Sequence, residues 1–417
     1  MKDAQSSSLS SPPPSSTPLS KLSQVRGGPR ASFARLVTTL GIAEPGPFPV
    51  LIGIALIWAF FQAQSPYFLS ARNLSNLILQ MGVTGILAIG VVLVMIAGEI
   101  DLSIGSVAGV CAGLLGVLLT FQHWPTAAAL AAVLALGLAA GLIQGLVTVY
   151  VGVPSFLVTL GGFLTWAGLQ LAVIGNEGEI PVASPFVLGI ANNYVPAAAA
   201  WAMALVAIAV AVAVELWRRR AWVAAGLAPP SWSRTGFKLG LIGGGLFALV
   251  GYLNAYFGIP YLLVILLGLT VIFGWVTRRT ILGRHLYAIG GNAEAARRAG
   301  VPVGPIRIAI LAMSGMFAAT AGVVSASRLF SVSVGTGGGT LLLEAIAAAV
   351  IGGTSLFGGR GRVYNAVLGA LVIVSIENGL DLLGQPAATK DIATGIILVL
   401  AISLDAISRR RRATAAA

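Results

Sequence analysis

The chain of 417 residues contains one cysteine, Cys111, and two histidines, His123 and His285. A single thiol cannot form an intramolecular disulfide, and these residues cannot supply a His/Cys zinc cluster or a Cys-x-x-Cys redox pair. Two histidines leave little scope for imidazole catalysis, and no nucleophile with a base and no cofactor motif is present. The sequence therefore predicts no metal and no cofactor, and it disfavours a membrane enzyme.

Charged residues are also scarce. They make up 9% of the chain, whereas soluble domains draw about a quarter of their residues from this group. Apolar residues make up 57%, and the mean hydropathy is +0.94. A soluble protein of this size could not cover its surface with so few charges, so the surrounding medium must be the lipid bilayer. The composition predicts an all-α fold, a polytopic bundle of transmembrane helices.

The net charge of +12 could suggest a nucleic-acid partner, but the distribution of the basic residues argues against one. Of the 25 basic residues, 22 fall in alternate connections between apolar runs, which we place on one side of the membrane. The other three are Arg72, Arg328 and Lys390. Cytoplasmic loops are enriched in Lys and Arg. We therefore predict a multi-pass plasma membrane protein with both termini in the cytoplasm.

The ends of the chain differ from its middle. A Ser/Pro cluster from Ser6 to Ser20 and basic residues without helical periodicity predict a disordered cytoplasmic tail over 1–46. No apolar stretch follows the basic start at once, so we expect no cleaved signal peptide. A transmembrane domain then covers 47–408, and 409–417 is a basic cytoplasmic tail.

Twelve apolar runs approach the roughly 20 residues that a helix needs to cross the hydrocarbon core. They predict about twelve spans, within a range of ten to twelve, because the runs at 260–277 and 391–407 are the weakest. Within one run, Gly137, Gly141 and Gly145 form a smooth stripe on which another helix can pack closely. The runs are 48–64, 77–97, 103–120, 127–150, 156–174, 197–216, 239–257, 260–277, 306–326, 341–357, 363–381 and 391–407.

Carboxylates near the bilayer interior are costly unless they line water or find a partner, so they mark candidate pathway residues. Glu99 and Asp101 lie in the segment GEIDLSIGS, residues 98–106, between two apolar runs. Glycine permits a break there, and Asp101 or Ser103 can cap the helix that restarts. Two interpretations stay open: a discontinuous membrane element whose helix ends face a polar solute, or a cytoplasmic turn in which Asp101 only caps.

Polar residues inside later runs allow the same two kinds of interpretation. Glu344 and Glu377 either line a pathway or form a hydrogen bond or salt bridge between helices. We include Glu344 in the predicted pathway, together with Asn378 near the end of the eleventh run.

A second glycine-rich segment, IGGTSLFGGRGR at 351–362, also separates two apolar runs. Its partial match to 98–106 is a weak indication of two equivalent halves, which many transporters contain. No lysine follows these glycines at the spacing of a phosphate-binding loop, so the segment does not bind ATP in that way. The matching pairs are Gly98 with Gly352, Leu102 with Leu356 and Gly105 with Gly359.

The long basic loop at 278–305 contains a predicted surface helix over 292–299. Asn292 can cap this helix, Glu294 falls in its first turn, two arginines lie near its end, and Gly300 stops it. Composition leaves two interpretations: a knob that a soluble partner grips, or a helix on the lipid surface whose arginines face anionic headgroups.

Four segments together resemble the membrane permease subunits of carbohydrate ABC importers of the ribose and xylose type. The resemblance spans about residues 50 to 405, and the extra segment from Trp217 to Lys238 is most similar to the xylose branch. It implies an ATP-driven sugar importer with two copies of this chain, two copies of a cytoplasmic ATP-binding subunit and an extracytoplasmic sugar-binding protein. The four segments lie at residues 74–106, at 152–161 (GVPSFLVTLG), in the loop GRHLYAIGGNAEAARRAG, and at 344–384.

The resemblance also implies roles for individual residues. Phe156 and Thr159, in GVPSFLVTLG, join the predicted pathway, and the segment around Glu294 matches the family's ATPase-coupling segment, which favours the docking interpretation. ATP hydrolysis is expected on the partner, so the chain itself is not an enzyme. The predicted pathway residues are Glu99, Asp101, Ser103, Phe156, Thr159, Glu344 and Asn378, and the predicted coupling residues are Gly283, Arg284, Asn292, Glu294, Ala295, Ala296 and Gly300.

Two other transport functions stay open. A proton-driven secondary transporter would use Glu99, Asp101 or Glu344 and would need no partner subunit. A permease for branched-chain amino acids would carry a carboxylate, which should prefer helix N-termini or arginine. The predicted pathway contains Glu, Asp, Asn, Ser and Phe, which favours a neutral sugar.

Overall fold

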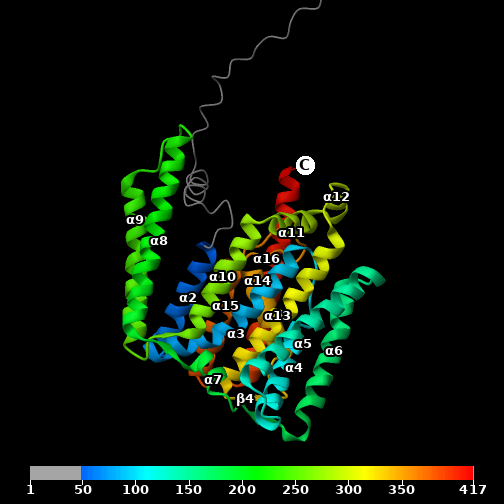
Figure 1. Ribbon diagram of the computed structural model, residues 1–417. Helices are drawn as coiled ribbons and strands as arrows, with labels where there is room; N and C mark the ends of the chain where they lie inside the picture. Colours follow the sequence, from blue (N-terminus) through cyan, green and yellow to red (C-terminus); the bar gives the residue numbers. More distant parts are fainter. Residues whose placement is uncertain (1–47, 417) are drawn as a thin grey trace, which may run out of the picture. The chain divides into compact units, whose positions relative to one another are not determined.

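The computed structural model describes residues 48–416, so the predicted tail at 1–46 lies outside the described residues. The described part is a bundle of helices with two short strand pairs (Figure 1), which confirms the predicted all-α polytopic fold. Its first half comprises α2 (Phe48–Gln64), α3 (Ala71–Ile96), α4 (Ile104–Gly116), η2 (Val117–Phe121), α5 (Thr126–Leu146), η3 (Val147–Val151), α6 (Ser155–Ile174), η4 (Gly175–Glu177), β1 (Glu179–Pro181), α7 (Pro185–Asn192), β2 (Tyr194–Val195) and α8 (Ala197–Ala224). Its second half comprises α9 (Trp232–Asn254), β3 (Ile259–Pro260), α10 (Tyr261–Arg279), α11 (Ile281–Gly291), α12 (Ala293–Arg298), α13 (Val303–Leu329), β4 (Ser331–Ser333), α14 (Gly339–Ile351), α15 (Val363–Leu382) and α16 (Ala387–Ala416).

Each of the twelve predicted apolar runs coincides with a helix of this bundle. Within the described residues, nine helical segments are long and apolar enough to cross a membrane, and the apolar helices 49–64 and α14 are shorter. The run predicted over 341–357 ends early, at Ile351, because Gly353 adopts a positive φ of 83° that terminates the helix.

The helices form an inner group and an outer group. In the most apolar stretch of α3, 89% of the residues are buried inside the protein, and α13, α14 and α15 all pack against this helix. In α8 and α9 the buried share is 11%, and Figure 1 shows these two helices as a pair at the edge of the bundle. Apolar side chains on such outer helices face lipid rather than water. The interior of the bundle, where a polar site would be shielded from lipid, therefore surrounds α3.

The predicted glycine stripe on α5 is confirmed as a packing surface for α13. A β-carbon on Gly137 would lie 2.4 Å from the carbonyl oxygen of Gly315, and one on Gly141 would lie 2.1 Å from that of Leu311. A side chain at either position would push the two helices apart. The helices can approach this closely only because small residues face each other.

Helix α14 begins inside the bundle rather than at its end. After β4 the chain turns back at 334–338, and a β-carbon on Gly337 would lie 2.4 Å from the backbone nitrogen of Gly109 in α4. The 13 residues of α14 extend about 20 Å at 1.5 Å per residue, which is less than the roughly 30 Å hydrocarbon core. This helix therefore has its first turn within the bundle.

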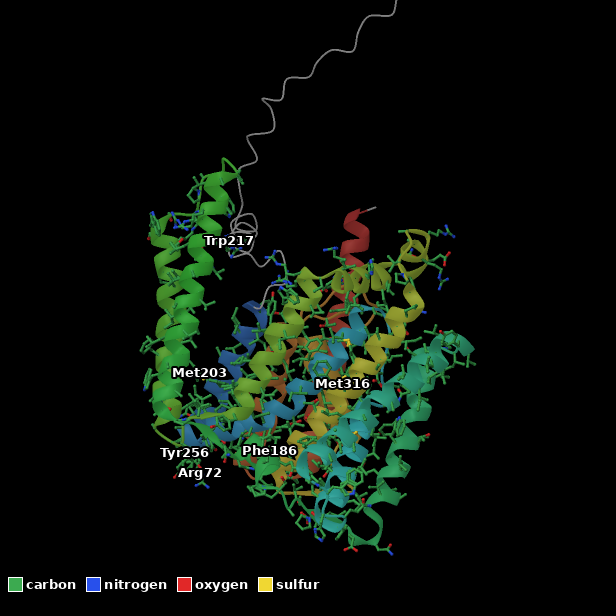
Figure 2. All side chains as sticks on the ribbon, viewed as in Figure 1. Arg72, Phe186, Met203, Trp217, Tyr256 and Met316 are labelled. Carbon is green, nitrogen blue, oxygen red and sulfur yellow. The ribbon has the colours of Figure 1, made fainter. Side chains whose placement is uncertain are left out.

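The basic connections gather at one end of the bundle. The turn between α8 and α9, the helices α11 and α12, and the end of α16 lie together there (Figure 1). Trp217 marks this end in Figure 2, whereas Arg72 and Tyr256 lie at the opposite end. The strand pairs β1–β4 and β2–β3 join distant parts of the chain, with Glu179 opposite Ser333 and Tyr194 opposite Pro260.

Candidate functional site

The chain between α3 and α4 is held in place by side chains of α6. Gly98 has a φ of 77°, a conformation that favours glycine, and α3 stops just before it. The backbone N–H of Ile100 then donates to Ser155 Oγ at 3.2 Å, and that of Leu102 donates to Thr159 Oγ1 at 3.0 Å. Thr159 is fully buried, so this predicted pathway residue fastens the break between the helices.

Asp101 is the centre of a buried hydrogen-bond network. Its Oδ1 accepts from the backbone N–H of Ser103 at 2.8 Å and from Ser103 Oγ at 2.7 Å. Its Oδ2 accepts from Ser314 Oγ of α13 at 2.6 Å, and Ser103 Oγ also lies 2.9 Å from Oε1 of Gln144 in α5. Asp101 therefore accepts the hydrogen bond of a backbone N–H group at the start of α4, whereas the side chain of Ser103 makes no capping bond of its own.

The break lies within the bundle. Ser314 is about 16 Å along α13 from Val303, at 1.5 Å per residue, and Asp101 is in direct contact with it. Asp101 is 6% exposed. These two observations favour the interpretation as a discontinuous element over that of a plain surface turn.

Glu99 faces a second region, nearer to the basic end. Its Oε1 forms an ion pair with Nε of Arg307 at 2.6 Å, and both residues line a cavity of about 500 Å³. Phe156 lines the same cavity with 44% of its surface exposed, and Arg297 of α12 reaches it as well. The predicted pathway residues Glu99 and Phe156 thus line the same cavity, and the predicted coupling helix contributes Arg297 to it.

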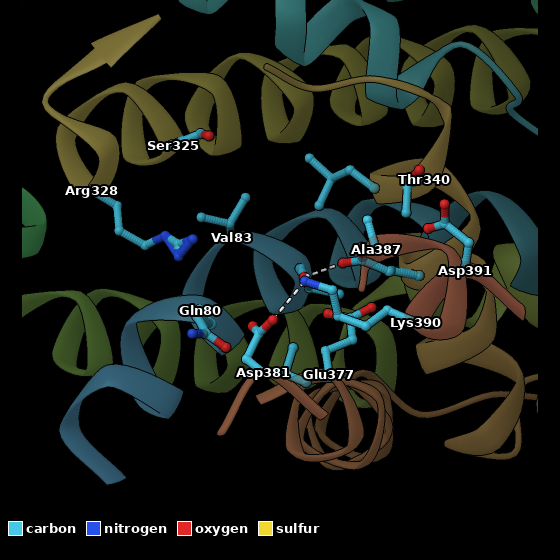
Figure 3. Close-up of a pocket in the computed structure, with 14 residues that line it drawn as sticks. Gln80, Val83, Ser325, Arg328, Thr340, Glu377, Asp381, Ala387, Lys390 and Asp391 are labelled. Atoms are coloured by element: carbon cyan, nitrogen blue, oxygen red, sulfur yellow. Dashed lines mark hydrogen bonds and ion pairs between the residues drawn. The ribbon is translucent and has the colours of Figure 1, made fainter. Parts of the chain in front are cut away.

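A polar cavity of about 330 Å³ lies among α3, α13, α14, α15 and α16 (Figure 3). It contains the predicted pathway residue Glu344, whose Oε2 accepts a hydrogen bond of 3.1 Å from Thr84 Oγ1. Polar side chains from five helices face one space that is surrounded by apolar helices, as a pathway for a polar solute requires. The lining residues are Gln80, Val83, Thr84, Ser325, Arg328, Thr340, Leu341, Glu344, Val374, Glu377, Asp381, Ala387, Lys390 and Asp391.

The charged groups of this polar cavity are arranged from its edge inward. At the edge, Lys390 Nζ pairs with Asp381 Oδ1 at 2.6 Å, and these side chains are 29% and 47% exposed. Arg328, in the last turn of α13, reaches toward the cavity (Figure 3). Within the described residues Arg328 forms no ion pair, so its guanidinium donors face the cavity. The described residues hold no cluster of three or more His, Cys, Asp or Glu side chains suited to a metal ion.

Asn378 is separated from these sites. It is 2% exposed, and its Oδ1 accepts a hydrogen bond of 2.7 Å from Nδ2 of Asn73 in α3. The same Asn73 nitrogen donates to the carbonyl oxygen of Phe68 at 2.8 Å. Asn378 thus joins α15 to α3, and the structure does not bring it into contact with Glu344, Asp101 or Glu99.

The predicted surface helix is α12, with the expected boundaries. Asn292 Oδ1 accepts from the backbone N–H of Ala295 at 2.9 Å, which caps the helix, and Gly300 follows it with a φ of 83°. Glu294 is 56% exposed and pairs with Arg297 and Arg298 at 3.1 and 3.2 Å. Exposed pairs of this kind add little to stability, so these charges are available to a partner.

Other predicted coupling residues have different environments. Ala296 is the buried side of α12, at 5% exposure. Gly283, early in α11, has no room for a side chain, because a β-carbon there would lie 2.1 Å from the carbonyl oxygen of Thr277. Ala295 supplies the capped N–H, and Arg284 lies on the exposed side of α11.

Helix α11 brings the two glycine-rich segments together. A β-carbon on Gly290 would lie 1.8 Å from the carbonyl oxygen of Ile96, and the N–H of Gly359 donates to this same oxygen at 2.9 Å. Tyr287 Oη donates to the carbonyl oxygen of Gly361 at 2.8 Å. Burial raises the pKa of Tyr287, so its hydroxyl keeps the proton that it donates. The arm α11–α12 is therefore attached to both segments through close backbone contacts.

Sequence reasoning missed most of the polar cavity. From the sequence, Arg328 is predicted only in a loop, Gln80 and Lys390 have no predicted link to Glu344, and Glu377 stays open between a pathway role and a bond between helices. Their shared signal is a polar residue at the end of an apolar helix, and this signal does not tell which helices are neighbours.

A helical bundle with buried polar cavities and an exposed helical arm at one end defines a membrane transport component. The chain belongs to the family described as "Branched-chain amino acid transport system / permease component", which it matches over residues 73–402. It is accordingly a multi-pass membrane permease subunit rather than an enzyme.

Three curated relatives cover nearly the whole permease. The xylose transport system permease protein XylH of Haemophilus influenzae is 37% identical over 87% of this chain and 96% of its own length. The probable ABC transporter permease protein YphD of Escherichia coli is 33% identical over 88% and 91%, respectively. The ribose import permease protein RbsC of Bacillus subtilis is 31% identical over 86% and 92%. No solved structure matches the chain.

Proposed function

We propose that this chain is the permease subunit of an ATP-driven importer for xylose or a related monosaccharide. The observation that carries the proposal is its 37% identity to a xylose transport permease over 87% of the chain. In this role the chain forms the translocation path and couples it to a separate ATP-binding subunit. A substrate-binding protein delivers the sugar on the opposite side, and two copies of the permease work together.

The polar cavity supports a neutral, hydroxyl-rich solute. It presents four carboxyl side chains, those of Glu344, Glu377, Asp381 and Asp391. Carboxylates accept hydrogen bonds from sugar hydroxyls, and a sugar in the bilayer must replace each hydrogen bond that it loses with water. Against these four acidic side chains, a solute carboxylate would find one cation without an ion pair among the described lining residues, Arg328, because Lys390 is already paired with Asp381. The lining therefore favours a sugar over a branched-chain amino acid.

The proposed path has two stations. The first is the polar cavity around Glu344, where Arg328 adds donors for sugar oxygens, and the second is the cavity beside Glu99 and Phe156. Asp101, Ser103 and Thr159 line neither cavity; they fix the break between α3 and α4 that carries Glu99, and Asn378 fixes α15 against α3. Contacts along such a path should be weak, because a tightly held sugar would not be released.

At the basic end, α12 is the proposed docking element for the ATP-binding subunit. It is short, exposed on one side and attached through α11 to the break between α3 and α4. In the proposed orientation this end and both termini face the cytoplasm.

Reconstitution tests the function. We expect vesicles that hold the permease and its ATP-binding subunit to accumulate xylose only with ATP and the binding protein. The permease alone should not accumulate sugar in a pH gradient. Accumulation by the chain alone in a pH gradient would replace the proposal by the proton-driven carrier.

A separate variant tests the first station. Glu344→Leu should abolish uptake while the complex still assembles. The substitution removes a carboxylate that would accept hydrogen bonds from the sugar, and it also removes the hydrogen-bond acceptor of Thr84. Thr84→Val, which removes only the donor to Glu344, should retain most of the uptake. Normal uptake by Glu344→Leu would exclude this cavity from the path.

A further inference from the structure

The turn between α8 and α9 carries a concentrated positive charge. Five basic residues, Arg218, Arg219, Arg220, Arg234 and Lys238, lie between 215 and 238, and Glu215 is the one acidic residue in this range. The proposed transport function does not use these residues. They lie on the outermost helix pair, away from α3 and the polar cavity.

Some of these residues build a defined cavity of about 430 Å³ between the two helix ends. The guanidinium of Arg219 lies 3.6 Å from the centre of the Trp232 ring, and its Nη1 donates to the buried Thr235 at 3.1 Å. Lys238 pairs with Glu215 at 2.9 Å. These contacts join α8 to α9 and fix the walls of the cavity.

Two other cations face the same space. Arg218 of α8 and Arg234 of α9 both line the cavity, and within the described residues neither side chain forms a hydrogen bond or an ion pair. The one carboxylate among the described residues that line this cavity, Glu215, is paired with Lys238, so two guanidinium groups remain for a further anion. A phosphate group matches this need, because the planar fork of arginine binds phosphate oxygens in pairs.

The surroundings indicate an anion that carries acyl chains. Trp217, which Figure 2 labels near this end, is 66% exposed, and Trp232 at the start of α9 is 65% exposed, as tryptophans are at a membrane interface. Phe237 and Leu241 continue from the cavity along α9 and are 76% and 69% exposed. An apolar track therefore leads from the cationic cavity into the lipid-facing surface of the helix pair.

We infer that this cavity binds the phosphate group of an anionic phospholipid between Arg218 and Arg234. The acyl chains lie along the apolar side chains of α9. Only 11% of the apolar stretch of α8 and of α9 is buried inside the protein, so few protein contacts fix this outer pair. The bound lipid therefore also stabilises the position of the two helix ends at the membrane interface.

The test is native mass spectrometry of the full-length chain in micelles with equal amounts of phosphatidylglycerol and phosphatidylcholine. We expect wild type to retain phosphatidylglycerol in preference. Arg218→Gln with Arg234→Gln should lower its occupancy by roughly thirtyfold, which corresponds to roughly 1 kcal/mol for each of the two basic residues near an anionic surface. The matched control is Arg220→Gln with Arg279→Gln, which removes the same charge; neither residue lines the cavity, so occupancy should fall much less than in the cavity variant.

A lysine variant and a competition with inorganic phosphate distinguish a phospholipid site from a general effect of charge. Arg218→Lys with Arg234→Lys retains the charge and loses the planar fork, so it should bind phosphatidylglycerol several-fold more weakly than wild type. Equal losses in the cavity variant and the control variant would overturn the inference, as would equal retention of the two lipids. Displacement of phosphatidylglycerol by millimolar inorganic phosphate would instead identify a site for soluble anions and would also overturn it. Retention of phosphatidylglycerol in its presence supports the lipid.

Discussion

The backbone of Gly358 packs directly against the backbone of Gly98, and a β-carbon added to Gly358 would come within 2.8 Å of the Gly98 α-carbon. The same added atom would lie 2.7 Å from the carbonyl oxygen of Gly290 in α11. One point therefore connects the break after α3, the turn after α14 and the arm that carries α12. The arm is therefore in backbone contact with both glycine-rich segments at this point.

Gly358→Ala should disrupt this point. Its φ of 84° disfavours a side chain, and the backbone contacts leave no room for one, so we expect a loss of about 2 to 5 kcal/mol in unfolding free energy. The control is Gly353→Ala, which has a similar φ of 83° but nothing within 4 Å, and should cost only about 1 to 2 kcal/mol. Unfolding titrations in mixed micelles measure both. Equal losses would show that backbone strain alone accounts for the effect.

Asp101→Leu and Asp101→Asn separate two roles of this carboxylate. Leu removes the acceptor for the buried Ser314 hydroxyl and for the backbone N–H of Ser103, at a cost of about 1 to 3 kcal/mol for each group left unpaired, whereas the Ser103 hydroxyl keeps Gln144 as a partner. Asn keeps one oxygen and can donate to the other hydroxyl, so its stability should stay close to wild type. Unfolding titrations and uptake assays are to be run on both. A stable Asn variant without uptake would assign the charge itself to transport, and a fully stable Leu variant would contradict the network.

Glu294→Arg tests the docking role of α12. Its ion pairs with Arg297 and Arg298 are exposed, so folding and insertion should be unchanged. Reversing the charge on the contact surface should lower ATP-driven uptake by about tenfold, which corresponds to about 1.4 kcal/mol at the interface. Glu177→Arg, an exposed acid in η4 beyond the far end of α6, is the matched control. Normal uptake and normal recruitment of the ATP-binding subunit by Glu294→Arg would contradict the assignment.

Orientation can be measured with cysteine labelling, because the native Cys111 is buried. Ala228→Cys, between α8 and α9, should react only with reagents that reach the cytoplasm, and Glu177→Cys only with external ones. Reporter fusions at residues 30 and 415 should both give cytoplasmic signals. External labelling of Ala228→Cys would reverse the proposed orientation.

The sequence predicted the helices well because a long apolar run in a membrane has few alternatives to a helix. It also predicted α12, because Asn292 and Gly300 are local signals for a helix start and stop. One boundary was harder: α14 ends at Ile351, six residues before the predicted run does, because Gly353 adopts a positive φ inside that run.

The site was predicted only in part. Glu99 and Asp101 are two residues apart, yet Glu99 meets Arg307 at a cavity edge and Asp101 meets Ser314 in a packed network. The polar cavity is lined by Arg328 of α13 and Glu344 of α14, which come from different helices. In a span that is apolar on every face, periodicity does not show which side meets a neighbour, so these partners could not be derived from spacing.

Helix α13 starts four residues beyond α12 and continues without interruption to Arg328 at the polar cavity, a length of about 40 Å. The glycines of α5 hold its middle so closely that it has little freedom to bend there. Helix α13 is therefore a rigid connection between the end near α12 and the polar cavity. In the proposed docking, a tilt of α13 at its Val303 end would also move the guanidinium of Arg328, because no loop interrupts the helix between these two residues.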